Sequence, residues 1–255
     1  MRNQTVTAAA LGCALIFAAS VPASADEIKV MSSNALKTVF EQLTPDFEKA
    51  THHKLVFTFG AGVPLKAAIE KDVSFDVAAL TTAAIDDLVK QGRLYATGRT
   101  IIAYANAGVA VRKGAAKPNI GTVDAFKRAL LEAKSIAIVE QGGTGIYLKA
   151  LLPRLGIADA VKDKIKFLPP ENPAANAVAN GEAEIGMTMI SEILPYAGAE
   201  LVGPLPKEIQ LTDAFAIAMS AESRRSEAVG ALIRFLAAPA AASVYKAKGL
   251  DPAGG

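Results

Sequence analysis

Four short loops contain the residue types best suited to holding a small ligand. Each loop follows a predicted strand, leads into a predicted helix and is rich in serine, threonine or glycine: Ser32-Ser33-Asn34, Gly60-Ala61-Gly62-Val63-Pro64, Thr81-Thr82 and Gln141-Gly142-Gly143-Thr144-Gly145. The first turn of a helix has backbone N–H groups without partners and a partial positive charge. Several helix starts that meet at one place can therefore bind a small anion without a charged side chain.

The order of these loops along the chain strengthens that interpretation. Taken singly, each loop is typical of an ordinary turn or helix cap. In an open α/β sheet, however, the carboxyl ends of the parallel strands face one crevice. Four such loops in corresponding positions therefore favour a binding site.

The motifs of common catalytic sites are missing from the sequence. There is no G-x-S-x-G, no H-E-x-x-H and no G-x-x-x-x-G-K-[ST]. His52 and His53 are adjacent, so on a strand they would point to opposite faces; a solvated corner between a helix and a strand accounts for them. Asp86 and Asp87 lie early in a helix, where negative charge favours the dipole. We therefore expect no catalytic residue, no metal and no cofactor.

The first 25 residues have the pattern of a signal peptide. Arg2 precedes an apolar run from Val6 to Ala19, and Pro22-Ala23-Ser24-Ala25 ends it with an A-x-A site, which predicts export and cleavage after Ala25. The run is shorter than the roughly 20 residues of a membrane-spanning helix. The only cysteine, Cys13, lies inside this leader. A lipid anchor at Cys13 is the less favoured alternative, because the apolar run continues beyond it.

Short apolar runs that alternate with helical periodicity indicate an α/β fold. The runs that predict strands are 27–31, 54–59, 77–80, 135–139, 165–168, 185–189 and 211–218, and 101–111 contains two further apolar stretches. One helix is predicted by the spacing of Leu36, Val39, Phe40, Leu43 and Phe47. We expect Pro45 to interrupt that helix, with Thr44 capping its second piece.

The length left after cleavage suits two modest domains. Removal of 25 residues from the 255 leaves 230, arranged as two series of strand, loop and helix. We expect residues 26–107 and 211–255 to form one lobe, residues 108–210 to form the second, and the ligand to bind in the cleft between them. The return of 211–255 to the first lobe is taken from fold knowledge.

The charge pattern excludes a polyanion as partner. The formal net charge is +2, Arg2 leaves with the leader, and the remaining lysines and arginines are scattered without a basic run. Nucleic-acid binding is therefore not expected.

Several segments resemble one known family, the periplasmic molybdate-binding proteins of ABC transporters, which belong to the type II two-lobed solute-binding proteins. The segments that carry the resemblance are Ile28–Leu36, Phe59–Ile69, Phe75–Ala79, Gly143–Leu151, Asn176–Gly186 and Lys246–Leu250. The resemblance implies two lobes, each a mixed sheet flanked by helices. It also implies a periplasmic, monomeric, non-catalytic receptor that closes over one small anion and delivers it to a membrane permease.

The sequence departs from that family at positions that contact the ligand in the family. Ala35, Gly62 or Val63, and Met189 stand where the family has hydroxyl donors, and Gly143 stands where it has proline. An unmatched buried polar group costs about 1 to 3 kcal/mol, which disfavours molybdate itself. One hypothesis keeps a small oxyanion. The other replaces it with an organic solute such as a carboxylate, whose apolar part rests on Val63 and Met189. Tyr147 either joins them or, as its helical position favours, packs inside its helix.

Both hypotheses use the same predicted contacts. These are Ser32, Ser33, Asn34, Ala61, Gly62, Val63, Thr81, Gly143, Thr144, Gly145, Asn172 and Met189. Asn172 has the alternative role of capping the helix that follows it. A secreted hydrolase on this scaffold is disfavoured because neither histidine is expected to reach a serine of the site. A sensor or scaffold that binds another protein remains a third class.

Overall fold

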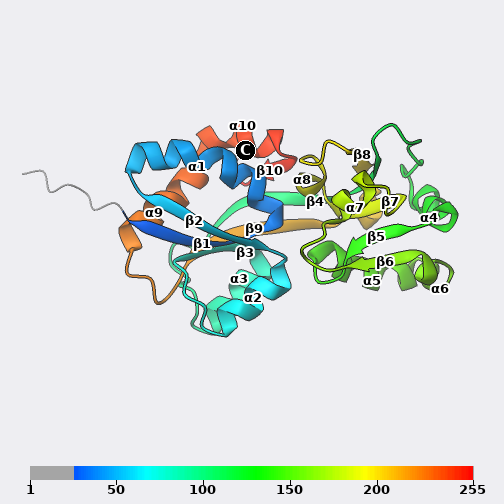
Figure 1. The fold of residues 1–255 in the computed structure, drawn as a ribbon. Helices are drawn as coiled ribbons and strands as arrows, with labels where there is room; N and C mark the ends of the chain where they lie inside the picture. The colour runs from blue at the N-terminus through cyan, green and yellow to red at the C-terminus, as the bar shows by residue number, and fades with distance from the viewer. Residues whose placement is uncertain (1–25, 255) are drawn as a thin grey trace, which may run out of the picture.

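A computed structural model describes residues 26–254. The predicted signal peptide, its cleavage after Ala25 and Cys13 lie outside the described residues. The described chain forms a mixed sheet with the strand order β2-β1-β3-β9-β4-β7-β5-β6, while β8 and β10 pair with β4. Helices flank the sheet in two groups, which confirms the predicted α/β fold (Figure 1).

The first group of elements is called lobe 1. Its strands are β1 (Glu27–Ser33), β2 (Lys54–Gly60), β3 (Val77–Thr81), β9 (Thr212–Met219) and β10 (Leu250–Pro252). Its helices are α1 (Lys37–Thr51), α2 (Gly62–Glu70), α3 (Thr82–Lys90), α9 (Ser226–Leu236) and α10 (Ala242–Ala247), with short 3-10 turns η1 (Asn34–Leu36) and η4 (Pro239–Ala241). Strand β1 runs parallel to β2 and β3, so the carboxyl ends of all three lie at the same edge.

The second group is called lobe 2. Its strands are β5 (Ile136–Val139), β6 (Ile165–Leu168), β7 (Ile185–Met189) and β8 (Ala199–Pro204). Its helices are α4 (Val123–Glu132), α5 (Gly143–Arg154), α6 (Ala158–Val161), α7 (Ala174–Ala179) and α8 (Ile190–Ile193), with 3-10 turns η2 (Lys162–Lys164) and η3 (Lys207–Ile209). Strand β5 runs parallel to β6 and β7.

Strand β4 (Thr100–Arg112) connects the two lobes. Between residues 100 and 106 it pairs with β9, and between 107 and 111 it pairs with β7. The chain returns from lobe 2 to lobe 1 between η3 and β9, and this second crossing lies beside β4. The Ala107 backbone N–H of β4 donates to the Leu211 carbonyl of the second crossing at 2.9 Å. The C-terminal segment lies with lobe 1: β10 pairs with β4, and α9 and α10 contact α1. The proposed division at 107/108 and 210/211 stays a prediction.

Helix α1 continues through Pro45, so the predicted interruption is wrong. The Thr44 hydroxyl, expected to cap a second helix, instead donates to the Phe40 carbonyl at 2.6 Å. The apolar stripe of this helix is buried throughout; it consists of Val39, Phe40, Leu43 and Phe47. Burial of such side chains contributes about 1.5 to 3 kcal/mol each, which outweighs the roughly 3 kcal/mol that an internal proline costs.

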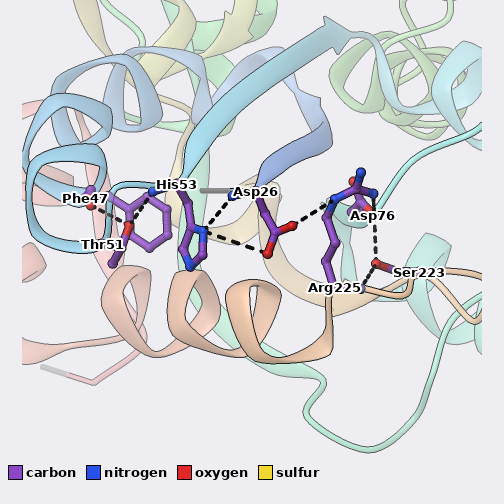
Figure 2. A network of polar contacts seen from close by, with 7 residues as sticks. All are labelled: Asp26, Phe47, Thr51, His53, Asp76, Ser223 and Arg225. Carbon is purple, nitrogen blue, oxygen red and sulfur yellow. Dashed lines mark hydrogen bonds and ion pairs between the residues drawn. The ribbon is translucent and has the colours of Figure 1, made fainter. Parts of the chain in front are cut away.

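The start of the described chain is fixed by a polar network at the edge of lobe 1 (Figure 2). The Asp26 backbone N–H donates to His53 Nδ1 at 3.1 Å. The carboxylate of Asp76, which is 3% exposed, accepts hydrogen bonds from the Ser223 hydroxyl at 2.7 Å and from Arg225 at 3.1 Å. The His53 side chain is only 12% exposed and stacks on Phe47, so the expected solvated corner is wrong for this histidine.

Two helices near the C-terminus are apolar enough to need comment. In the part of the chain that the structure describes, no single helix is long and apolar enough to cross a membrane. Helix α9 and the helical stretch 239–247 reach that length and composition only as a pair, and they are bent by 54°.

Candidate functional site

A cleft of about 990 Å³ lies between the two lobes. Its lobe 1 wall contains the carboxyl ends of β1, β2 and β3 with the helix starts that follow them, and its lobe 2 wall contains the start of α5, the end of β7 and α8. The parallel pairing of β1 with both neighbours explains why loops far apart in the sequence meet here. Pockets of this size hold small organic ligands.

The lobe 1 wall presents hydroxyl groups that also cap helices. The Ser33 hydroxyl accepts from the Ala35 backbone N–H at 3.3 Å, and the Thr81 hydroxyl accepts from the Ala84 N–H at 3.4 Å. In both bonds the hydroxyl oxygen is the acceptor, so its own hydrogen stays free to donate. Ser33 and Thr81 therefore face the cleft as donors with fixed positions.

The lobe 2 wall is built on the start of α5. Gly143, Thr144 and Gly145 all line the cleft, and Thr144 is 5% exposed. A Cβ atom at Gly145 would lie 2.1 Å from the Val139 carbonyl oxygen, so only glycine lets the helix start so close to the end of β5. This approach brings the backbone N–H groups of the first turn to the cleft.

Two further hydroxyls in the cleft were not predicted from the sequence. Ser191, on α8, is 2% exposed and its hydroxyl has no hydrogen-bond partner within the described chain. The buried hydroxyl oxygen of Thr38, on α1, likewise has none among residues 26–254. The two hydroxyls come from opposite lobes, because α1 belongs to lobe 1 and α8 to lobe 2. The two walls meet here, since α8 contacts η1, which immediately precedes α1. Buried polar groups without partners are uncommon and suggest positions that a ligand satisfies.

The cleft also contains an acid, Asp213, that the sequence reasoning missed. Burial raises the pKa of the Asp213 carboxyl, and neither a hydrogen bond nor a charged neighbour offsets that effect. One of its oxygens, Oδ2, lies 2.9 Å from the point where a Cβ of Gly143 would be. A residue with a side chain at position 143 would force this carboxyl to shift. The only sequence signal was glycine at a position where the resembling family has proline.

A second acid, Glu192, lies on α8. Burial raises the pKa of the Glu192 carboxyl, which accepts a hydrogen bond from the Thr188 hydroxyl. The pKa of the neighbouring Tyr196 phenol is raised by burial and by the charge of Glu192. All three side chains line the cleft wall of lobe 2.

Two lysines are the basic residues of this lining, and one of them is neutralised. Lys66 Nζ lies 2.5 Å from Glu70 and 2.7 Å from Asp87, and these contacts raise the pKa of Lys66. Lys37 Nζ is 3.8 Å from Glu41 at the rim. An anion in this cleft would therefore be held mainly by hydroxyls and backbone N–H groups.

The structure brings together all but two of the predicted contact residues. Those that line the cleft are Ser33, Asn34, Ala61, Gly62, Val63, Thr81, Gly143, Thr144, Gly145 and Met189. Ser32 is fully buried and its hydroxyl donates to the Ser33 carbonyl, because neighbouring side chains on a strand point to opposite faces. The Asn172 side-chain oxygen accepts from Asn176, and only its sequence neighbours line the cleft. The Tyr147 hydroxyl donates to the Ile209 carbonyl at 2.8 Å, which ties α5 to η3.

The residues present do not form a metal site. No group of three or more histidine, cysteine, aspartate or glutamate side chains suited to a metal occurs among residues 26–254. What the cleft offers is a set of hydrogen-bond donors, apolar contacts from Val63 and Met189, and carboxyl groups with raised pKa values.

Comparisons with known proteins agree with this geometry. Residues 28–251 match the family described as bacterial extracellular solute-binding protein. The chain is 31% identical over 253 residues, 95% of each chain, to a protein of Pseudomonas sp. named aconitate isomerase. It is 26% identical over 252 residues, 94% of each chain, to the molybdate-binding protein ModA of Azotobacter vinelandii.

A solved structure supports the fold. The periplasmic molybdate-binding protein of Azotobacter vinelandii superposes with a TM-score of 0.74 at 21% identity, covering 88% of this chain and 98% of that one. The resemblance read from the sequence motifs and the two-lobed type II fold are thereby confirmed. The chain belongs to the family of bacterial extracellular solute-binding proteins.

Proposed function

We propose that this protein is exported to the periplasm and binds a small organic carboxylate, of the size and charge of aconitate, in the cleft between its lobes. The observation that carries the proposal is Asp213, a carboxyl that has no hydrogen-bond or charged partner among residues 26–254 and lies against the first turn of α5. This is the place where an anion would meet the backbone N–H groups of that helix.

The apolar part of the lining favours an organic carboxylate over a compact oxyanion. An organic ligand has carbon atoms to place against Val63 and Met189, which a molybdate ion lacks. Burial raises the pKa of Asp213, and in its protonated form Asp213 can donate a hydrogen bond to a ligand carboxylate.

The relatives support the same direction. The protein named aconitate isomerase shares more identity with this chain than ModA does, 31% against 26%, over similar coverage. Three positions where the resembling family has hydroxyl donors hold Ala35, Gly62 or Val63, and Met189 here. The unpartnered hydroxyls of Ser191 and Thr38 lie elsewhere in the cleft, which suits an anion of a different shape.

Binding would close the lobes by bending at the two crossings beside Ala107. As a transport receptor, the closed protein would then deliver the carboxylate to a membrane permease. The prediction of a monomer fits this role and stays a prediction.

A thermal-shift screen with calorimetry tests the proposal. The ligands are cis-aconitate, trans-aconitate, citrate, molybdate, tungstate, sulfate and phosphate. A ligand at 100 times its Kd adds about 2.7 kcal/mol, which for a chain of this size corresponds to a rise in Tm of roughly 5 to 10 °C. We expect this rise with an aconitate isomer. A larger rise with molybdate or sulfate would refute the carboxylate assignment and favour the oxyanion hypothesis.

A matched pair of variants locates the binding. Thr144→Val should reduce the rise in Tm because it removes a hydroxyl from the cleft wall. Thr97→Val, in the exposed turn before β4, makes the same change away from the cleft and should leave the rise unchanged.

A further inference from the structure

Resting on the proposed carboxylate ligand, we infer that Asp213 is a catalytic residue that moves a proton between two carbon atoms of an unsaturated polycarboxylate. In aconitate, a CH₂ group adjoins a carbon–carbon double bond, so such a transfer relocates the double bond within the same three-carbon unit. The inference adds a reaction and an acid–base residue to the binding function.

The position of Asp213 is the first argument. Its carboxyl lies in the cleft, on β9 close to the crossing between the lobes, and against the start of α5. The glycine at 143 leaves the space that this carboxyl occupies, since a Cβ there would be 2.9 Å from Oδ2. A carboxyl that only stabilised the fold would be held by partners, as Asp76 is.

The second argument is its basicity. A general base works best when its pKa is near the ambient pH, and burial raises the pKa of Asp213 toward that range. The histidines do not supply an alternative, because neither of them lines the cleft and His53 Nδ1 accepts from the Asp26 backbone N–H.

The third argument is the set of donors that line the same cleft as the acid. Removal of a proton from the CH₂ group leaves an anion whose charge spreads onto a carboxylate oxygen. The hydroxyls of Ser33, Thr81 and Thr144 and the N–H groups at the start of α5 are positioned to stabilise that charge.

The atoms and electrons of the step balance without a further reagent. The Asp213 carboxylate takes one proton from the CH₂ carbon, and the electron pair of that C–H bond forms a new double bond to the central carbon. The old double bond opens, and its electron pair takes the same proton back from Asp213 at the far carbon. Asp213 returns to the carboxylate form, and the ligand is isomerised without oxidation.

Proton NMR in D₂O tests this inference with the full chain expressed with its own leader. The protein is mixed with trans-aconitate, and exchange of the CH₂ hydrogens and appearance of the cis isomer are followed while calorimetry measures binding. We expect the parent chain to bind and to exchange. Asp213→Asn should bind within a few fold but exchange about 10² to 10⁴ times more slowly.

Three further variants separate catalysis from a structural effect. Asp46→Asn, on the exposed face of α1, makes the same change away from the cleft and should match the parent. Asp213→Glu should restore part of the exchange. Gly143→Ala keeps the carboxyl but displaces it, so exchange should fall by at least tenfold, which keeps the test informative if Asp213→Asn folds poorly.

The outcomes are distinguishable. Binding by the parent chain without any exchange overturns the catalytic inference and leaves the proposed function standing. Exchange that survives in Asp213→Asn overturns the role of Asp213. Absence of binding to every carboxylate in the screen overturns the proposed function and this inference together.

Discussion

Two polar clusters on this molecule contrast sharply, one at the edge of lobe 1 and one in the cleft. At the edge, the buried Asp76 carboxylate accepts hydrogen bonds from the Ser223 hydroxyl and from Arg225 (Figure 2). It also accepts one from the backbone N–H of Lys29. In the cleft, the described chain offers no such partner to Asp213 and none to the hydroxyl of Ser191. Because folding favours satisfied polar groups, stability explains the Asp76 carboxylate, whereas a ligand explains the Asp213 carboxyl.

The largest expected difference between the two clusters is in the free energy of unfolding when Asp76 or Asp213 is replaced by alanine. Asp76→Ala leaves the Lys29 backbone N–H and the Ser223 hydroxyl without their acceptor and should lower the free energy of unfolding by about 3 kcal/mol. Asp213→Ala breaks no hydrogen bond and should change it by less than about 1 kcal/mol. Urea unfolding followed by circular dichroism measures both. Equal losses would contradict the division into a structural and a functional cluster.

A pair of serine variants sharpens the same comparison. Ser223→Ala removes a hydrogen bond to the Asp76 carboxylate and should cost about 1.5 to 3 kcal/mol of stability without affecting ligand affinity. Ser191→Ala removes a hydroxyl that has no partner, so stability should stay the same while ligand affinity falls by about 0.5 to 1.5 kcal/mol. Urea unfolding and calorimetry report the two effects separately. Loss of stability rather than affinity in Ser191→Ala would remove Ser191 from the site.

The pH dependence of stability should show a smaller difference. The folded pKa of Asp213 is raised, so the folded state binds this proton more tightly than the unfolded chain does. The stability linked to it is therefore present below the ordinary Asp pKa and is lost as the pH rises through the folded pKa. Asp213→Asn should gain Tm relative to the parent chain near pH 7, and this gain should shrink toward pH 4. A gain independent of pH would disprove the linkage.

The sequence predicted the elements better than it predicted their contacts. Helical spacing and apolar runs located most strands and helices, because those patterns reflect burial on one face. It missed β8 and β10, which both pair with β4. The predicted interruption at Pro45 considered only the local cost of a proline inside a helix. Helix α1 continues through Pro45 because its apolar stripe is buried.

The candidate site shows the same division at the level of single residues. The loop motifs identified Ser33, Thr81 and the start of α5, since helix starts have a recognisable composition. Ser32 was included because the predicted strand ended at Met31, whereas β1 continues to Ser33 and turns Ser32 away from the cleft. Thr38, Ser191 and Asp213 belong to no motif. Their importance depends on what the opposite lobe places beside them.

The sequence by itself determined the α/β class, the order of the elements and the family, because these follow from periodic burial and from short local motifs. Only the tertiary structure decided which polar groups are satisfied and which are not. Asp76 and Asp213 have the same side chain, and their difference arises from neighbours that are distant in the chain. Hydrogen bonding and burial depend on position in space, so the clearest evidence for a ligand appears once the two lobes are assembled.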